Sequence, residues 1–282
     1  MSKPTRLIGL MAVFGLLVIP SSLAAASAQA STLPTVTVTV SNSSISVSGA
    51  LQSGAANVVM NAAAGSKEPA PTLFLLKPGV TVAEVDAYLK TKKTAQDPNS
   101  TIKYGSIAFD AEASAGKSVE AQTYLQPGTY VALNGAGEDS AKWPTTSFTV
   151  TASTAPASLP APAATEQSID FSFRGPSTLH DGELVRFENA GYLVHMDFAF
   201  PVKNMASAKK AVKALKAGEE KGLEKLIAGP PIGFAGPLSN GAYQQETITA
   251  KPGVYVQVCF MPTQDGRAHT MLGMERIIKI TK

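Results

Sequence analysis

Alternation of apolar and polar residues after residue 30 predicts a half-buried β-strand. Thr35-Val-Thr-Val-Thr-Val40 alternates without a break, which is the two-residue period of a strand with one face toward a core. Further short stretches rich in β-branched and aromatic residues follow, separated by turn signals. In the first part of the chain they predict strands at 41–48, 72–76, 107–109, 118–124, 130–133 and 147–151.

A second series of strands is predicted beyond residue 167, in a similar order. These strands lie at 169–173, 184–187, 196–200, 243–249, 254–261 and 276–280. Each series also predicts a helix. Thr81-Val-Ala-Glu84 has the form of a capping box at the start of the first helix. The stretch 206–226, interrupted at Gly218, predicts the second.

The two series repeat each other, which predicts a tandem duplication. The matching landmarks are Phe74 with Phe198, Leu89 with Leu215, and the Pro-Gly-x-Tyr turns at 127–130 and 252–255. Residues 153–167 between the series are rich in Ala, Ser, Thr and Pro and predict an extended linker. We therefore predict a mainly β protein with two β-sandwich domains, 31–152 and 168–282, each with a helical insertion.

The first thirty residues, 1–30, have the pattern of a secretory signal peptide. Lys3 and Arg6 form a positive region, Leu7 to Ile19 is an uninterrupted apolar run, and small residues up to Ala30 offer A-x-A cleavage sites. The alternative is an uncleaved membrane anchor, for which the apolar run is short. The sequence thus predicts a secreted or extracytoplasmic protein with no transmembrane segment in the mature chain.

The composition argues against nucleic acid as a partner and against an internal disulfide. The 282 residues include 24 Lys and Arg against 21 Asp and Glu, a net charge of +3, so nucleic acid is not an expected partner. The single cysteine, Cys259, rules out an internal disulfide. In an oxidising compartment Cys259 is a buried thiol, a metal ligand or half of an intermolecular disulfide.

The segment 255–274 gathers three kinds of side chain that copper binds. Cys259 supplies a thiol, His269 an imidazole and Met274 a thioether. Such a mixed set of soft and borderline donors suits copper. His195, at the start of a predicted strand, is a further imidazole.

Two stretches of the second part resemble the copper-binding elements of plastocyanin-like proteins. Arg186-Phe-Glu-Asn-Ala-Gly-Tyr-Leu-Val-His195 is similar to the strand and loop that deliver the first histidine, and Gly253-Val-Tyr-Val-Gln-Val-Cys259 is similar to the second half of that site. From about Ser168 onward the chain therefore resembles the cupredoxin, or blue copper, family. The resemblance implies tandem Greek-key sandwiches, with His195, Cys259 and His269 as equatorial copper ligands and Met274 as the axial one. The first part is a weaker copy with no Cys or His, so it has no such ligands.

Two features of this region bear on its geometry. Nine residues separate Cys259 from His269, more than in the short loop of plastocyanin-like proteins, and they include a predicted turn at Gln264-Asp-Gly266. Strand alternation places Cys259 on the less apolar face of its strand and His195 on the same face as Asp197. Asp197 is then either an acceptor that orients the imidazole or a sign that His195 faces solvent or a groove between the domains.

No motif of a hydrolytic or nucleotide-dependent enzyme occurs, and no catalytic residue is predicted. Cys259 lies inside a β-run rather than at a helix N-terminus, which does not favour a nucleophilic cysteine.

We expect a secreted, non-enzymatic, cupredoxin-like binding protein without a cofactor, whose partner is an unidentified protein or envelope component. The alternative is a mononuclear copper-binding or electron-transfer protein that uses the C-terminal domain. His180, in a turn before a strand, is expected at the surface.

Overall fold

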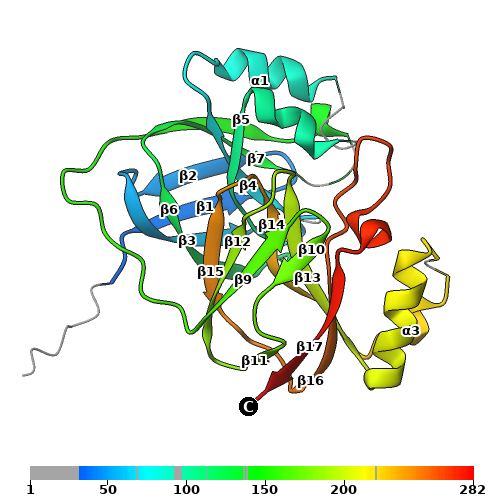
Figure 1. Cartoon of the computed structure of the whole chain (residues 1–282). Helices are drawn as coiled ribbons and strands as arrows, with labels where there is room; N and C mark the ends of the chain where they lie inside the picture. Colours follow the sequence, from blue (N-terminus) through cyan, green and yellow to red (C-terminus); the bar gives the residue numbers. More distant parts are fainter. Residues whose placement is uncertain are drawn as a thin grey trace, which may run out of the picture. The chain divides into compact units, whose positions relative to one another are not determined.

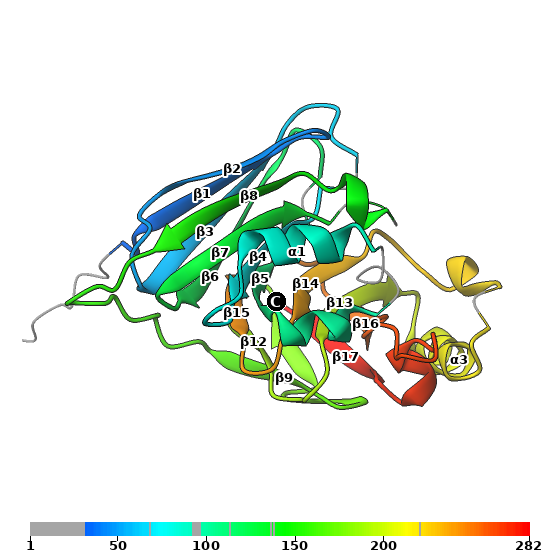
Figure 2. The same ribbon diagram turned by 90° about the horizontal axis from the view of Figure 1, so that it is seen from above.

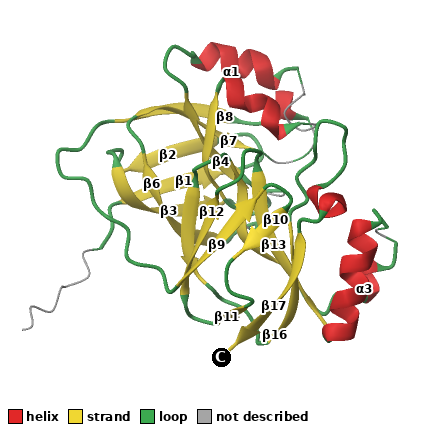
Figure 3. Cartoon of the chain, viewed as in Figure 1, coloured by secondary structure: helices red, strands yellow, loops and turns green. Residues whose placement is uncertain are grey.

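Strands dominate the structure, a computed structural model that describes residues 32–67, 69–91, 97–112, 114–135, 137, 139–219 and 221–282 (Figures 1 and 3). The predicted signal peptide lies outside these described residues. No helix in the described ranges is long and apolar enough to cross a membrane.

The first half of the chain, which we define as the elements from β1 to β8, contains the strands and helices that follow. In chain order they are β1 (Thr35–Val40), β2 (Ile45–Gly49), β3 (Gly54–Ala62), β4 (Pro71–Leu76), α1 (Val82–Leu89), the 3₁₀ helix η1 (Pro98–Lys103), β5 (Gly105–Asp110), β6 (Ser118–Leu125), β7 (Gly128–Asn134), η2 (Ser140–Lys142) and β8 (Thr145–Val150). Helix α1 begins where the capping box predicted it, because the Thr81 hydroxyl accepts from the Glu84 N–H and the Glu84 carboxylate accepts from the Thr81 N–H.

The second half consists of the elements from β9 to β17. In chain order they are β9 (Ala164–Ile169), β10 (Ser172–Arg174), β11 (Thr178–His180), β12 (Leu184–Asn189), β13 (His195–Val202), α3 (Met205–Lys216), η3 (Leu223–Lys225), β14 (Ile232–Leu238), β15 (Tyr243–Thr247), β16 (Gly253–Val258), η4 (His269–Leu272) and β17 (Glu275–Thr281). Helix α1 follows β4 in the first half and α3 follows β13 in the second, so each half contains the predicted helical insertion.

Each half is a sandwich of two sheets, and the halves share one of these sheets. Strands β10-β9-β12-β15-β6-β3-β1-β2 form a continuous eight-stranded sheet, joined where β15 of the second half pairs with β6 of the first. The sheet β5-β4-β7-β8 completes the first sandwich, and β11-β17-β16-β13-β14 completes the second. In Figure 2, β1 and β2 lie toward one end of the view and β17 with α3 toward the other.

Strand pairing repeats between the halves. β1 pairs antiparallel with β2 and parallel with β3, and β9 pairs antiparallel with β10 and parallel with β12. The antiparallel pairs β3–β6, β4–β5, β4–β7 and β7–β8 recur as β12–β15, β13–β14, β13–β16 and β16–β17. The predicted tandem duplication of a mainly β sandwich is therefore confirmed.

Both Pro-Gly-x-Tyr turns form the same tyrosine corner. The Tyr130 hydroxyl donates to the Gln126 carbonyl at 3.0 Å, and the Tyr255 hydroxyl donates to the Lys251 carbonyl at 2.8 Å. Such a corner fixes the turn that enters a strand of a Greek-key sandwich. These two turns anchor the alignment of β7 with β16.

The strand register corrects one of the predicted landmarks. Phe74 pairs with Val131 in the first half, and Phe200 pairs with Val256 in the second. Val131 and Val256 each follow the tyrosine of the corner directly. Phe200, not Phe198, is therefore the counterpart of Phe74.

Strands β3, β11 and β14 were not predicted, and β9 was predicted only at its last residue, Ile169. β3 is rich in Gly, Ala and Asn, which lowers β-propensity, yet it lies between β1 and β6, where small side chains pack closely. β14 contains Pro237, which is tolerated because β14 is an edge strand. β9 begins at Ala164, so the last residues of the segment predicted as a linker are in a strand.

Both faces of strand β16 are buried. Its inward residue Tyr255 packs in the sandwich core, while Val256 and Val258 pack on the other side against Ala208, Ala211 and Leu215 of α3. Figure 1 shows α3 beside β16 and β17. Because the helix covers the outer face, strand alternation separates two buried environments here instead of a core from solvent.

Candidate metal centre

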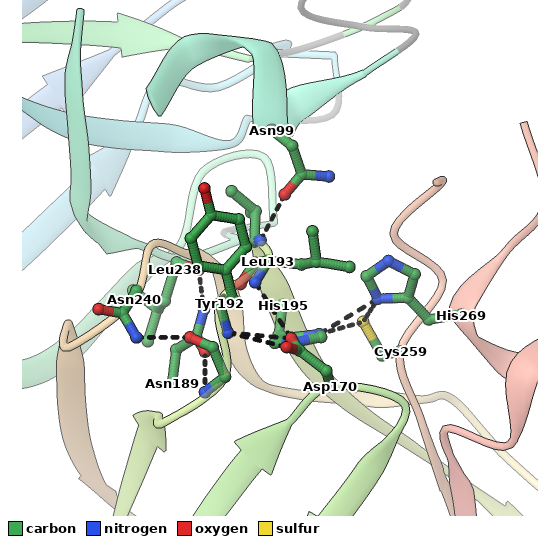
Figure 4. A network of polar contacts seen from close by, with 12 residues as sticks. Asn99, Asp170, Asn189, Tyr192, Leu193, His195, Leu238, Asn240, Cys259 and His269 are labelled. Atoms are coloured by element: carbon green, nitrogen blue, oxygen red, sulfur yellow. Dashed lines mark hydrogen bonds and ion pairs between the residues drawn. The ribbon is translucent and has the colours of Figure 1, made fainter. Parts of the chain in front are cut away.

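Segments far apart in the sequence meet beside Cys259 (Figure 4). Cys259 directly follows β16, His195 begins β13 and His269 begins η4. A donor atom from each of the three lies within 4.8 Å of the other two. The structure therefore brings together the residues predicted as equatorial ligands.

The three donor atoms form a small buried triangle. The Nδ1 atoms of His195 and His269 are 3.1 Å apart, and the Cys259 Sγ lies 3.4 Å from Nδ1 of His269 and 3.8 Å from Nδ1 of His195. At most 1% of any of these residues is exposed. The alternative that His195 faces solvent is therefore excluded, because His195, like Cys259, is buried in the interior of the second half.

Met274 lies next to this triangle. It is fully buried and packs in one apolar cluster with Cys259 and Phe173. Its backbone also ties the segment together, because its carbonyl accepts from the Cys259 N–H at 3.2 Å and its N–H donates to the His269 carbonyl at 3.1 Å. The thioether of Met274 therefore lies close to Cys259. Its role as the axial ligand, which the family resemblance implies, stays a prediction.

The nine residues between Cys259 and His269 form a small hairpin. Its backbone contacts are the Pro262–Ala268 bridge, the 2.8 Å bond from the Thr263 N–H to the Arg267 carbonyl, and the 2.9 Å bond from the His269 N–H to the Met261 carbonyl. The additional residues form a hairpin whose two ends are joined by these hydrogen bonds. His269 therefore lies beside Met261, and Met261 is only two residues after Cys259 in the chain. The geometry expected of a short loop is kept by these hydrogen bonds.

Asp170 orients the imidazole of His195. Its Oδ1 lies 3.0 Å from Nε2 of His195 and also accepts from the N–H groups of Tyr192 and Leu193 at 3.0 and 3.1 Å (Figure 4). Burial raises the pKa of Asp170, but these hydrogen bonds outweigh it and hold the pKa below its ordinary value. An ionised carboxylate on Nε2 leaves the Nδ1 lone pair facing Cys259, which is the arrangement of a metal-binding histidine.

Asp197, which the sequence offered as this acceptor, does not contact His195. Both of its carboxylate oxygens accept from Nε2 of Gln257 at 2.7 Å, inside the sandwich. Asp197 and His195 are both buried on this strand, but their side chains have different partners. Asp170 was missed because it is 25 residues away from His195 in the chain, and a single sequence carries no sign of that contact.

The turn between β9 and β10 supplies two groups to the centre. Ile169 pairs with Ser172, so the chain reverses at Asp170-Phe171 and the predicted continuous strand 169–173 is wrong. Phe171 has a φ of 61°, an uncommon left-handed conformation for a residue other than glycine. Its ring packs edge-on against that of His269, with centroids 5.2 Å apart. The reversal thus places an acceptor on one histidine and a ring on the other.

The loop before His195 is fixed from several sides. The Asn189 side chain donates to the Leu193 carbonyl at 2.7 Å, and the Val194 N–H donates to Oδ1 of Asn99 at 2.7 Å. Asn99 belongs to η1, so the first half helps to position the histidine of the second. A Cβ on Gly191 would lie 2.7 Å from Nε2 of His195, which explains the glycine at that position.

Burial controls the protonation of the three donors. It lowers the pKa of His195, and together with the neighbouring His195 it lowers the pKa of His269 to about 4. Burial raises the pKa of the Cys259 thiol to about 12. At neutral pH the centre therefore holds two neutral imidazoles and one thiol, and metal binding would displace the thiol proton.

The hydrogen bonds of the centre do not provide a partner for every ring nitrogen of His195 and His269. Nδ1 of His195 faces Nδ1 of His269, while Nε2 of His269 is buried and has no hydrogen-bond partner among the described residues. With its proton on Nδ1, His269 leaves Nε2 as an unpaired acceptor; with its proton on Nε2, two lone pairs face each other at 3.1 Å. A cation among the three donors would take up both Nδ1 lone pairs.

The other predicted features lie outside this centre. His180 is exposed, as expected, but it is the last residue of strand β11 and does not lie in a turn. Its Nδ1 lies 2.7 Å from the Thr281 hydroxyl. Cys259 is a free, fully buried thiol, which leaves no exposed sulfur for an intermolecular disulfide. Of the three roles that the sequence left open for Cys259, a buried thiol and a metal ligand remain.

No protein-family model and no curated protein matches this chain. Among solved structures, the chain is similar to dithionite-reduced auracyanin from Roseiflexus castenholzii, with 17% identity, 42% of this chain and 95% of auracyanin covered, and a TM-score of 0.26. It is also similar to a copper-containing nitrite reductase from Thermus scotoductus SA-01, with 14% identity, coverages of 88% and 67%, and a TM-score of 0.25. At these TM-scores the likeness adds no weight to the strand pairing and the donor set described above.

The strand pairing shows two tandem β-sandwich halves, the arrangement that the cupredoxin resemblance implied. In the first half, Asn134 occupies the place of Cys259. The Ala70 N–H donates to Oδ1 of Asn134 at 2.8 Å, as the Met196 N–H donates to the Cys259 Sγ at 3.4 Å. The fold thus keeps this backbone contact whether or not the residue can bind a metal.

Proposed function

We propose that this protein binds one copper ion through His195, Cys259 and His269, with Met274 as a weaker fourth ligand, and that it transfers single electrons. Two imidazoles and a thiolate with an axial thioether are the donor set of blue-copper electron-transfer sites. The observation that carries the proposal is the buried triangle of donor atoms, at 3.1, 3.4 and 3.8 Å. It favours the copper alternative over the metal-free binding protein expected from the sequence.

The size of the triangle fits a metal ion. Metal–nitrogen and metal–sulfur distances of about 2.0 and 2.3 Å in protein sites imply donor separations of roughly 3.3 to 3.8 Å. The three observed separations are close to this range. Both imidazoles present Nδ1 to the thiol, and neither needs to lose a proton at neutral pH to act as a ligand.

Copper, when bound, would supply a change between Cu(II) and Cu(I) by one electron. The protein's part is to hold the donors in place during that change. Asp170 fixes the ring of His195, Phe171 packs against the ring of His269, and the Met196 N–H donates to the Cys259 sulfur. A set of donors fixed in this way reorganises little, which favours rapid electron transfer.

We infer a role without catalysis, because four protein side chains would occupy the metal and leave no open position for a substrate. The apolar N-terminal segment supports an extracytoplasmic location, and the redox partner is a protein or envelope component of unidentified nature. These inferences rest on the donor set and on the sequence pattern at 1–30.

The experiment is a titration of the purified mature protein with Cu(II), followed by visible absorption. We expect an intense thiolate-to-copper band at one equivalent, which is absent in Cys259→Ser and unchanged in His180→Ala. His180→Ala is the matched control because it removes a histidine that lies outside the centre. A colourless protein that does not retain copper would end the proposal.

A second measurement separates ligands from neighbours. Asp170→Ala removes the acceptor on Nε2 of His195 and keeps all four ligands. Loss of such a partner lowers metal affinity by about 10- to 100-fold, so we expect weaker copper binding with the absorption band retained. Equal affinity in Asp170→Ala and the unaltered protein would mean that His195 is not a ligand.

A further inference from the structure

A pocket of about 320 Å³ lies in the first half, beneath helix α1 and beside the metal centre. Its lining is largely apolar and aromatic and includes Phe74, Val85, Leu89, Tyr104, Leu133 and Trp143. Met196 and Met261 close it from the second half, and both also pack against the cluster that contains Cys259. A volume of this size and a lining of this kind are typical of small-molecule sites.

The polar side chains of the pocket include two carboxyl groups and no base. Asp110 and Glu112 are among its lining residues, and no lysine, arginine or histidine of the described chain lines it. Burial, and to a smaller extent the Glu112 carboxylate, raise the pKa of Asp110. A cation inside the pocket would therefore meet complementary charge, and an anion would meet repulsion.

Asp110 is buried and incompletely bonded. The Thr72 hydroxyl donates to Oδ2 of Asp110, and both residues line the pocket. Oδ1 is buried, has no hydrogen-bond partner within the described ranges and lies against the backbone of Gly236. Burial raises the pKa of Asp110 well above its ordinary value. A buried carboxyl oxygen without a donor is costly, and a ligand that brings a donor would relieve that cost.

The aromatic rings of the pocket wall already attract a cation. The ammonium group of Lys103 lies 4.7 Å from the ring centroid of Tyr104 and 5.7 Å from that of Tyr88. Both tyrosines line the pocket, although Lys103 does not. Ring faces at these distances stabilise a positive charge, which agrees with the acidic character of the polar groups.

We propose that this pocket binds a small aromatic amine as its ammonium ion, with the ring among the apolar side chains and the ammonium group at Asp110. The site is separate from the three copper donors and does not require a metal. It goes beyond the proposed function, and it can be tested on metal-free protein.

The test compares three probes that share one ring. Metal-free mature protein is titrated calorimetrically with 2-phenylethylammonium, 2-phenylethanol and 3-phenylpropanoate at pH 7. We expect the ammonium ion to bind at least about tenfold more tightly than the alcohol, since charge-assisted hydrogen bonds are the stronger ones, and the carboxylate not to bind. Absence of ammonium binding at millimolar concentration, or equal binding of the alcohol or the carboxylate, overturns the proposal.

Variants place the binding at Asp110. Asp110→Asn keeps the shape and is expected to lower ammonium affinity at least about tenfold, while alcohol affinity stays the same. Glu112→Gln is expected to lower it less, and it leaves the buried carboxyl intact. The matched control is Asp86→Asn, which neutralises a carboxylate on α1 outside the pocket lining. Unchanged ammonium affinity in Asp110→Asn contradicts the proposal.

The sole tryptophan provides a local signal. Trp143 lines the pocket, and the chain contains no other tryptophan. Its fluorescence is expected to change with the same midpoint as the calorimetric titration in the unaltered protein, and at higher concentration in Asp110→Asn. Calorimetric binding with no change in Trp143 emission would place the amine elsewhere and overturn the assignment.

Discussion

The two sandwich halves differ most at the end of one strand. After β16, Cys259 accepts from the Met196 N–H, faces two histidines and lies beside Met274. After β7, Asn134 accepts from the Ala70 N–H, and its own N–H donates to the Pro144 carbonyl at 3.0 Å as that of Cys259 donates to Met274. The backbone frame is therefore the same in both halves, and the thiol and the two histidines are an addition to it. We expect this frame to form without a metal.

The interiors of the halves differ as well. In the second half, Arg276 donates to Gln257, Gln257 donates to Asp197, and Arg276 also pairs with the fully buried Glu166. In the first half, the positions of the Gln257–Arg276 pair are held by Ala132 and Thr146, which are partners in the equivalent register. The half with the candidate metal donors thus carries a network of polar and charged side chains at positions where the first half has Ala132 and Thr146.

The largest expected effect comes from replacing the cysteine of the second half with the asparagine found at the same position of the first half. Cys259→Asn places the residue of the first half in the second, so the thiolate-to-copper band should vanish completely. The amide is expected to accept the Met196 N–H as Asn134 accepts that of Ala70, so the metal-free protein should unfold at a similar temperature. Visible absorption and thermal unfolding of the metal-free form measure the two outcomes.

The control for this conversion lies in the first half. Asn134→Cys alone should create no second copper band, because that half contains no histidine. If Cys259→Asn kept the band, the sulfur would not be the ligand. If it unfolded the metal-free protein, the frame would depend on Cys259 after all.

The charged network of the second half predicts a pH effect on stability. Burial raises the pKa of Glu166 to about 8, although Arg276 opposes the shift. Between the ordinary pKa of 4.5 and about 8, Glu166 therefore holds a proton in the folded protein that it has lost in the unfolded chain. The free energy of unfolding should therefore fall as pH rises through this window and level off above it.

Glu166→Gln should remove the part of this pH dependence that comes from Glu166. The variant cannot titrate there, so its stability relative to the unaltered protein should rise from pH 4.5 to 8, by a few kcal/mol in total. Urea unfolding at several pH values measures it, with Glu120→Gln, at an exposed position of the first half, as the control. Parallel pH profiles for Glu166→Gln and the unaltered protein would show that Glu166 is ionised throughout.

The structural features that occur in both halves could be predicted from the sequence. The duplicated strands, the capping box at Thr81 and the tyrosine corners are local patterns, so the printed sequence contains them in full. It also named the three donors that meet at the centre, because a thiol and imidazoles near strand ends are rare in this chain. Strands β3 and β14 were missed because Gly, Ala and Pro hide a strand whose stability comes from its neighbours.

Contacts between distant segments could not be predicted in the same way. Asp170 reaches His195 only because the chain reverses at Phe171, and Asn99 reaches Val194 only because the two halves pack together. The interval between Cys259 and His269 looked too long for a copper loop, since its closure depends on hydrogen bonds between residues of ordinary type. Each of these is a tertiary effect on a locally ambiguous segment.

Asn134 itself should matter for stability. Asn134→Ala leaves the Ala70 N–H without its acceptor in a nearly buried position, at a cost of about 1–3 kcal/mol. Asn134→Cys retains an acceptor of the kind found in the second half, so it should cost less. Urea unfolding distinguishes them, and equal stability of the two variants would show that the backbone contact contributes nothing to the frame.

The smallest expected effect concerns the two tyrosine corners. Tyr130→Phe and Tyr255→Phe each remove one hydroxyl hydrogen bond and keep the buried ring, so each should lower the free energy of unfolding by about 1 kcal/mol. Tyr192→Phe, at a position that is 71% exposed, should change nothing. Equal losses would mean that the corner stabilises the repeated frame independently of the metal donors. A loss confined to Tyr255→Phe would instead tie the corner to β16, the strand that ends at Cys259, and would break the equivalence of the two halves.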